Sequence, residues 1–129
     1  MSAGTPAGTP QSAEIVDLPR AVPGPPEGWQ ESFRYDLGDG RVLHGYSETW
    51  TLAGTPGRHW RGSEFHGIVR FEHVCDRGSR GVIVCAPELQ IGAGHTLTGG
   101  DNGPTVRASI LCEDCGTHGF VTEGRWADA

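Results

Sequence analysis

The sequence predicts an all-β fold, either a small single-domain sandwich or a partly open barrel. Short segments alternate apolar and polar residues with the two-residue period of a strand, and turn signals rich in glycine separate them. No stretch of ten residues keeps a 3.6-residue apolar period without Gly or Pro, so we expect no helix. A length of 129 residues fits one domain, because domains usually hold roughly 100–200 residues.

The expected strands begin after Trp29. Residues 33–37 alternate, and the following Gly38-Asp39-Gly40 supplies the positive-φ residues that a hairpin turn needs. The longest candidate covers residues 65–75, and side chains on one of its faces recur every two residues. That face carries Val69, Phe71, His73 and Cys75. The other candidates are residues 41–46, 48–52, 81–85, 95–98, 105–111 and 119–126, the last folded over at Glu123-Gly124.

Residues 1–28 are expected to form an extended arm, and residues 29–129 the β-domain. Six of the nine prolines lie in the first segment, together with a tandem Ala-Gly-Thr-Pro at 3–6 and 7–10. Proline lacks a backbone N–H and glycine raises the entropy cost of ordering, so neither helix nor sheet is expected there. Such an arm orders when it lies across another subunit, which predicts protein partners in an assembly contacted through residues 1–28.

Charge and hydropathy exclude two classes of partner. The formal net charge is -6, from ten arginines, no lysine and sixteen carboxylates, whereas a nucleic-acid-binding protein normally carries a basic surplus. No run approaches the roughly 20 apolar residues of a membrane helix, and the N-terminus has no basic-then-apolar signal peptide. We therefore expect a soluble protein with no nucleic-acid or membrane partner and no export by a signal peptide.

Apolar side chains are scarce for a domain of this length. Leu, Ile, Val and Phe make up about 19% of the chain, which is near the composition of disordered proteins. Small cores of this kind usually need cross-links, either disulfides or a metal ion. The four cysteines of the chain are available for either kind of cross-link.

The sharpest local motif is Cys112-Glu-Asp-Cys115, followed by Gly116. Two thiolates at this spacing can chelate one ion, and the glycine lets the backbone turn tightly around it. Closed tetrahedral coordination needs two more ligands, and Cys75 and Cys85 are the only other thiols. The sequence therefore predicts structural Zn²⁺ on Cys75, Cys85, Cys112 and Cys115, with His73 and His118 as possible substitutes. Apparent binding of roughly 10–16 kcal/mol would compensate for the small core.

Two other interpretations of the thiols stay open. Disulfides Cys75–Cys85 and Cys112–Cys115 would also cross-link the chain, although nothing in the sequence indicates an oxidising compartment. Free buried thiols or a redox pair are the other possibility. A thioredoxin-like Cys-x-x-Cys opens a helix after a strand, whereas the glycines that follow this pair oppose a helix.

Motifs of catalysis are missing from the sequence. Zinc nucleobase deaminases need His-x-Glu upstream of Pro-Cys-x-x-Cys, and here Ile110-Leu111 precede Cys112. The metalloprotease spacing His-Glu-x-x-His does not occur, and Ser63 and Ser109 lack a paired base in a nucleophile motif. Four cysteines on one ion would leave no open position, so we expect a non-enzymatic protein.

Cys115-Gly-Thr-His118-Gly119 resembles the second ligand box of Rieske iron–sulfur proteins, Cys-x-x-His-Gly. The first box should read Cys-x-His, but the chain has the reverse order in His73-Val-Cys75. The resemblance implies a [2Fe–2S] electron-transfer domain, in which two His ligate one of the irons. Such a protein would be coloured, which separates this alternative from a zinc domain.

A second pattern extends over residues 65–126. Its segments are His73-Val-Cys75, Leu97-Thr98, Ala108-Ser109-Ile110, Cys115-Gly-Thr-His118-Gly-Phe120 and Gly124-Arg125-Trp126. In this pattern the chain resembles a family of small uncharacterised bacterial and phage-encoded zinc-site β-domains. Cys85 and the Cys112/Cys115 pair depart from the way that family groups its thiols. The resemblance implies a metal-stabilised β-domain, frequently phage-borne, with no established catalytic activity.

The arm and this resemblance together predict a structural or accessory protein of a phage particle, such as a capsid decoration or a head–tail component. The alternative is a cytoplasmic module that binds a host protein through its acidic surface. A Rieske-like electron-transfer domain is the second alternative. The expected location is accordingly a virion or the host cytoplasm.

The remaining histidines, tryptophans and glycine-rich segments are expected to be structural. His44, His59, His66 and His95 are scattered and are interpreted as surface or loop residues rather than ligands. Trp50, Trp60 and Trp126 are expected to fill the core. The glycine-rich segments 92–94 and 99–103 do not lead into a helix that could bind phosphate, so they are expected to be loops.

Overall fold

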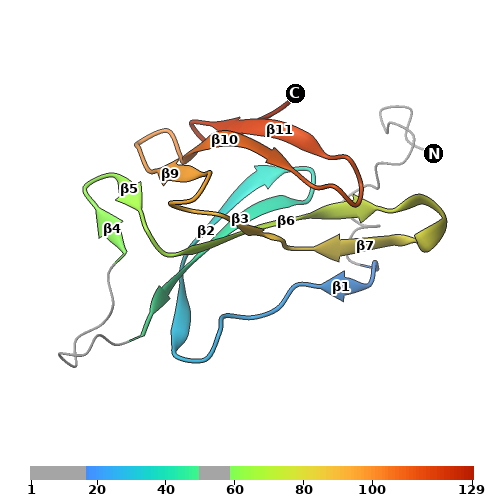
Figure 1. The fold of residues 1–129 in the computed structure, drawn as a ribbon, viewed down its shortest axis with the longest axis horizontal. Coiled ribbons are helices and arrows are strands. Elements are labelled where there is room, and N and C mark those ends of the chain that lie inside the picture. Colours follow the sequence, from blue (N-terminus) through green and yellow to red (C-terminus); the bar gives the residue numbers. More distant parts are fainter. Residues whose placement is uncertain (1–16, 50–58) are drawn as a thin grey trace.

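The structure, a computed structural model, describes residues 17–49 and 59–129 and is nearly all β (Figure 1). Its strands are β1 (Arg20–Ala21), β2 (Trp29–Gly38), β3 (Arg41–Glu48), β4 (Trp60–Arg61), β5 (Glu64–Phe65), β6 (Ile68–Asp76), β7 (Val82–Cys85), β8 (Glu88–Leu89), β9 (Thr96–Thr98), β10 (Thr105–Leu111), β11 (His118–Thr122) and β12 (Arg125–Asp128). Among the described residues, the helical structure is limited to a 3₁₀ turn, η1 (Gly78–Arg80). The all-β prediction is confirmed.

The strands form two sheets. The first sheet has the order β1-β7-β6-β3-β2, with β8 also paired to β6, and the second has the order β12-β11-β10-β9-β5-β4. Neighbouring strands are antiparallel except for β1 and β7, which are parallel. The two sheets do not join into a closed barrel, so the architecture is that of a small sandwich.

The core lies between the two sheets, because each strand turns every second side chain inward. Its buried members come from both sheets and are Leu43, Phe65, Val69, Phe71, Leu89, Leu97, Val106, Ile110 and Val121. Trp126 of β12 stacks on Phe71 of β6 with 5.2 Å between the ring centroids. This pair joins the second sheet to the first. Trp126, which was expected to fill the core, is partly buried and packs against it.

The predicted strand over residues 65–75 is divided between the two sheets. Phe65 ends β5 in the second sheet, whereas β6 starts at Ile68 in the first. A side chain on the intervening Gly67 would collide with the Tyr46 carbonyl oxygen and with the Phe65 ring. Glycine therefore allows the chain to pass closely over β3 as it crosses from one sheet to the other. The predicted fold-over at 123–124 is confirmed as the turn between β11 and β12.

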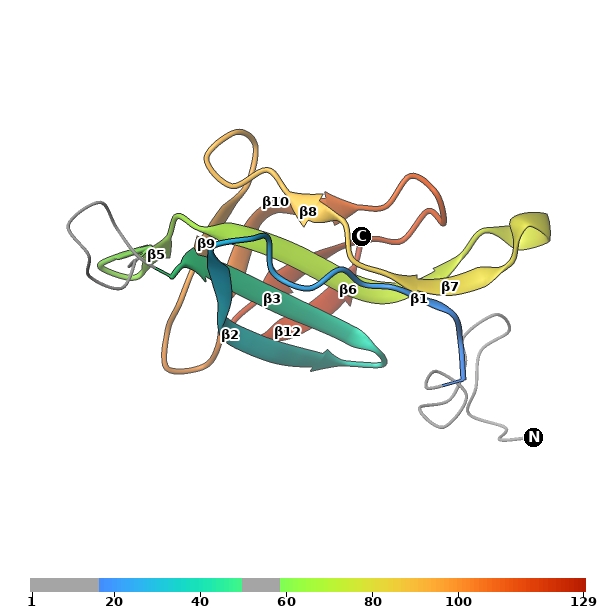
Figure 2. The ribbon, with the colours of Figure 1, turned by 90° about the horizontal axis from the view of Figure 1, so that it is seen from below.

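The expectation that residues 1–28 contain no sheet is wrong at Arg20–Ala21, which forms β1. The strand pairs with the end of β7, and the Pro19 carbonyl accepts a 2.9 Å hydrogen bond from the Val84 N–H. Proline is compatible with this edge position because it lies before the strand and contributes only its carbonyl. After β1, the chain crosses the outer face of the first sheet (Figure 2), where Arg70 donates hydrogen bonds to two of its backbone carbonyls.

Some predictions fall on residues 1–16 and 50–58, which lie outside the described residues. They concern the tandem repeat, Trp50 and the end of the expected strand 48–52. The division of the chain into arm and domain at residue 28 stays a prediction. In the part of the chain that the structure describes, no helix has the length and apolar character to cross a membrane.

Trp60 and His44 lie where the sequence analysis did not place them. Trp60 of β4 is 43% exposed, so the expectation that it fills the core is wrong. His44 of β3 is only 4% exposed, so its assignment to the surface is wrong as well. Its ring nitrogens lie 2.7 Å from a Glu31 oxygen and 2.8 Å from a Glu72 oxygen. The other oxygen of Glu72 accepts a 3.1 Å hydrogen bond from Arg20 of β1, and these partners explain how the polar ring is buried.

Candidate metal centre

Strand β6 carries two of the predicted ligands on its core-facing side. His73 and Cys75 follow Val69 and Phe71 at two-residue intervals, and all four side chains are buried. The face predicted for this strand is thereby confirmed. His73 stacks on Phe71 with 4.9 Å between the ring centroids, which holds the imidazole in place at the edge of the core.

Cys85 reaches the same place from β7. The antiparallel register puts Cys85 opposite His73, so the two side chains leave neighbouring strands side by side. The Cys85 sulfur lies 3.8 Å from His73 Nε2. Cys75 and Cys85 are ten positions apart, which is not the spacing of a zinc ribbon. The β6–β7 hairpin nevertheless brings the two residues to the same place.

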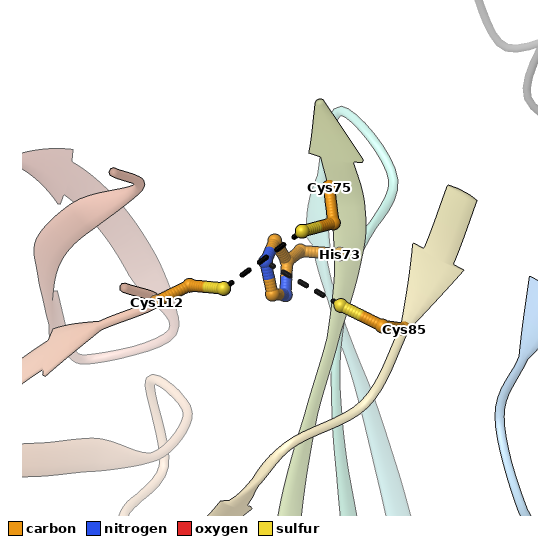
Figure 3. A group of neighbouring side chains, drawn as sticks. All are labelled: His73, Cys75, Cys85 and Cys112. Atoms are coloured by element: carbon orange, nitrogen blue, oxygen red, sulfur yellow. Dashed lines mark hydrogen bonds between the residues drawn. The ribbon is translucent and has the colours of Figure 1, made fainter. Parts of the chain in front are cut away.

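The second sheet contributes Cys112 and Cys115 from the turn after β10. Gly116 N–H donates a 2.8 Å hydrogen bond to the Cys112 carbonyl, and Cys112 N–H donates one of the same length to the Thr117 carbonyl. Gly116 has a φ of 77°, in the left-handed region that glycine tolerates. This is the tight turn that the sequence predicted for the Cys-x-x-Cys-Gly motif, and it aims Cys112 across the sandwich (Figure 3).

The ligand atoms of His73, Cys75, Cys85 and Cys112 all lie within 4.8 Å of one another. The sulfurs of Cys75 and Cys112 are 3.9 Å apart. Ligand atoms held 2.0–2.3 Å from a tetrahedral zinc ion would lie roughly 3.5–3.8 Å apart. The Cys75–Cys112 and Cys85–His73 separations, 3.9 and 3.8 Å, are close to the edges of such a tetrahedron, and the group could hold a metal ion.

A backbone contact sets the protonation of the His73 ring. Its Nδ1 lies 3.3 Å from the Phe71 carbonyl oxygen, which can only accept a hydrogen bond. The proton is therefore assigned to Nδ1, and Nε2 keeps its lone pair directed at the thiols. Metal-ligating histidines usually donate their other N–H to a carbonyl or carboxylate in this way.

Cys115 lies beside this group as a fifth soft donor. Its sulfur is 3.5 Å from His73 Nε2 and 3.1 Å from the Thr117 hydroxyl oxygen. Four positions of a tetrahedron are thus approached by five side chains. His73, which the sequence analysis counted as a substitute, lies in a group with Cys75, Cys85 and Cys112. The Cys115 sulfur is closer to His73 Nε2 than the Cys85 sulfur is, so the predicted ligand set of four cysteines stays a prediction.

His118, the other predicted substitute, is directed elsewhere. It is exposed, and its Nε2 lies 2.9 Å from the Ser109 hydroxyl oxygen. A Rieske cluster needs two imidazoles on one iron, and the group of candidate ligands contains only His73. All four cysteines are free thiols, so the alternative interpretation, with disulfides Cys75–Cys85 and Cys112–Cys115, does not hold in this structure.

Burial controls the charge of the group. It raises the pKa of the Cys75 and Cys85 thiols, because a thiolate would lose its hydration there. It also lowers the pKa of His73, which favours the neutral imidazole that ligates metals. Burial acts upward on the Cys115 pKa as well, but hydrogen bonds with Thr117, Cys112 and Cys75 together outweigh it and lower that pKa. Thiolates at this place need a compensating positive charge, which a divalent cation supplies.

Comparisons of the chain with protein-family models, with curated proteins and with solved structures find no match. The resemblance to phage-encoded β-domains therefore stays a prediction. The interpretation of this site rests on its own geometry, that is, on the spacing of the four ligand atoms and on the orientation of His73.

Proposed function

We propose that this protein is a non-enzymatic β-domain stabilised by one structural Zn²⁺ ion, which His73, Cys75, Cys85 and Cys112 ligate. The mutual spacing of their ligand atoms, all within 4.8 Å, is the observation that carries the proposal. Three thiols and one imidazole are the soft and borderline donors that zinc prefers in structural sites. A tetrahedron completed by protein side chains has no open position for a substrate, which supports a structural rather than a catalytic role.

The proposed ion would connect parts of the chain that the small core connects only weakly. His73 and Cys75 belong to β6, Cys85 to β7 of the same sheet, and Cys112 to the end of β10 in the second sheet. One ion would therefore cross-link both layers near one end of the sandwich. In the unfolded chain these ligands are dispersed, so the free energy of binding would appear as free energy of folding.

Elemental analysis of the full chain, purified without added metal, tests the proposal. We expect one zinc per chain and a colourless protein. Replacement of zinc by Co²⁺ should give the intense near-ultraviolet absorption of cobalt–thiolate bonds. A protein that contains iron and inorganic sulfide would instead support the Rieske-like alternative, and a metal-free, fully folded protein would refute both.

We further propose, on the sequence evidence alone, a role as a structural or accessory component of a phage particle. Arg20 and Ala21 pair with β7, and the Pro23 and Gly24 carbonyls accept hydrogen bonds from Arg70, but most of residues 17–28 are exposed. The proposed contact with neighbouring subunits through residues 1–28 stays a prediction. Mass spectrometry of purified particles should find the protein at stoichiometric level. Its absence from particles, together with capture of a defined host protein, would favour the cytoplasmic binding module.

A further inference from the structure

A cavity of about 340 Å³ opens between β2, β4 and the loop 99–104. Its volume is in the lower part of the range of small-molecule sites, roughly 300–1,000 Å³. The lining consists of Phe33, Arg34, Tyr35, Trp60, Leu97 and the loop 99–104. None of these residues belongs to the candidate metal centre. Figure 1 shows β4 and β9 at the side of the sandwich away from the tip of the β6–β7 hairpin.

One wall of the cavity is aromatic and is held rigidly. Trp60 is 43% exposed, yet its ring packs 5.0 Å from the Phe65 ring and 5.9 Å from the Phe33 ring, measured between centroids. A Cβ atom on Gly99 would lie only 3.1 Å from the outer atoms of the same indole. Because its neighbours fix it, the exposed ring could bind a ligand with little further loss of conformational entropy.

The loop 99–104 supplies the polar part of the lining. It turns tightly through a 3.1 Å hydrogen bond from Gly103 N–H to the Gly100 carbonyl, and its tip exposes Asp101 and Asn102. A carboxylate only accepts hydrogen bonds, whereas a carboxamide both donates and accepts them. The loop therefore offers both halves of the hydrogen bonds that a hydroxyl group makes.

We propose that this cavity binds a neutral saccharide. The C–H groups on the flat face of a pyranose ring carry partial positive charge and suit the negative face of an aromatic ring. The hydroxyl groups around the edge of the pyranose suit Asp101 and Asn102. The Asp101 carboxylate repels anions, which favours a neutral polyhydroxylated ligand over a phosphate or a polyanion. The wall that Trp60 and Phe33 form supplies the ring-sized apolar surface.

The proposal is tested by titrating the full-length, metal-loaded protein with three neutral trisaccharides: triacetylchitotriose, cellotriose and maltotriose. Chemical shifts in ¹H–¹⁵N spectra should move at residues 33–35 and 99–103 and at the Trp60 indole with at least one of the sugars. Trp60→Ala and the double variant Asp101→Ala/Asn102→Ala should each weaken that binding at least tenfold. The double variant replaces two exposed side chains, so it tests the cavity without a change in the core.

Phe120→Ala is the matched control, because Phe120 is exposed to a similar extent, 46%, on β11. It should leave the binding unchanged. The proposal is overturned if none of the three sugars shifts the cavity residues at millimolar concentration, or if Phe120→Ala weakens binding as much as Trp60→Ala does. Shifts at these residues with inorganic phosphate or with the peptide Ala-Gly-Thr-Pro-Ala-Gly-Thr-Pro, but with none of the sugars, would also overturn it.

Discussion

The sulfur atoms of Cys75 and Cys112 lie 3.9 Å apart, although the residues belong to opposite sheets and are 37 positions apart in the sequence. Cys75 belongs to the same inward face of β6 as the core residues, and Cys112 follows the last residue of β10. A cation between them would replace apolar contacts that a chain with so few large aliphatic residues cannot supply. This relationship leads to the following predictions.

Removal of the metal should unfold the domain. An apparent binding free energy of about 10–16 kcal/mol equals or exceeds the usual stability of a small domain, about 5–15 kcal/mol. Thermal melting followed by circular dichroism, with and without a chelator, measures the effect. The melting transition should be lost with the chelator and restored by excess Zn²⁺. An unchanged melting temperature in a protein shown to be metal-free would contradict a structural role of the ion.

Single substitutions should separate the ligands from their neighbours. Cys75→Ser and Cys112→Ser should abolish stoichiometric zinc binding, because each removes one corner of the tetrahedron. Cys115→Ser should retain one zinc per chain, since the Cys115 thiol lies beside the group of four. Competition with a chromophoric chelator measures the affinities. Equal loss in the Cys115 variant would move this thiol into the coordination sphere.

The two histidines of the sequence prediction provide a matched pair. His73→Gln should weaken zinc binding at least tenfold, because Nε2 of His73 faces the thiols. His118→Gln should not change it, because His118 contacts the Ser109 hydroxyl at the exposed surface. The same chelator competition compares them. A larger effect at His118 would mean that the ligand set has been assigned wrongly.

Glu72 should be important for stability although it is not one of the candidate metal ligands. Its carboxylate is buried and accepts hydrogen bonds from His44 at 2.8 Å and from Arg20 at 3.1 Å. Glu72→Ala removes the partner of His44 Nε2 and of the partly exposed Arg20 guanidinium, and Glu31 remains only at His44 Nδ1, so the change should cost about 3 kcal/mol. Glu31→Gln, at the more exposed partner of His44, should cost about 1 kcal/mol. Urea denaturation measures both, and equal values would indicate that burial of Glu72 is unimportant.

Gly45 should tolerate no side chain. A Cβ atom at this position of β3 would collide with the Phe33 ring, which packs against the core from β2. Gly45→Ala should therefore destabilise the domain by about 1–3 kcal/mol through overpacking. Gly24→Ala is the control, because nothing lies within 4 Å of a Cβ atom there. If the two variants unfold at the same urea concentration, the close contact between β2 and β3 is not as described.

Local patterns predicted most of the strands and the face of β6 that carries candidate ligands, because both depend on short-range periodicity. The two-residue period of β6 brings His73 and Cys75 to one face, and the Cys-x-x-Cys-Gly spacing implies the turn after β10. The meeting of β6 with that turn depends on how the two sheets pack. Sequence spacing also does not decide whether His73 or Cys115 is the better candidate ligand. Their positions depend on the β6–β7 register and on the contact of Cys115 with Thr117.

Features that depend on tertiary contacts left no local signal. β1 has only two residues, too few for a period, and it pairs with a strand more than 60 positions later. The burial of His44 depends on carboxylates from β2 and β6, which sheet register brings to the same face.

X-ray absorption at the zinc K-edge of the full chain is the most direct test of the ligand assignment. The assignment predicts a first shell of three sulfurs at about 2.3 Å and one nitrogen at about 2.0–2.1 Å. Co-purified zinc surrounded only by oxygen and nitrogen, or a folded protein without metal, would contradict it.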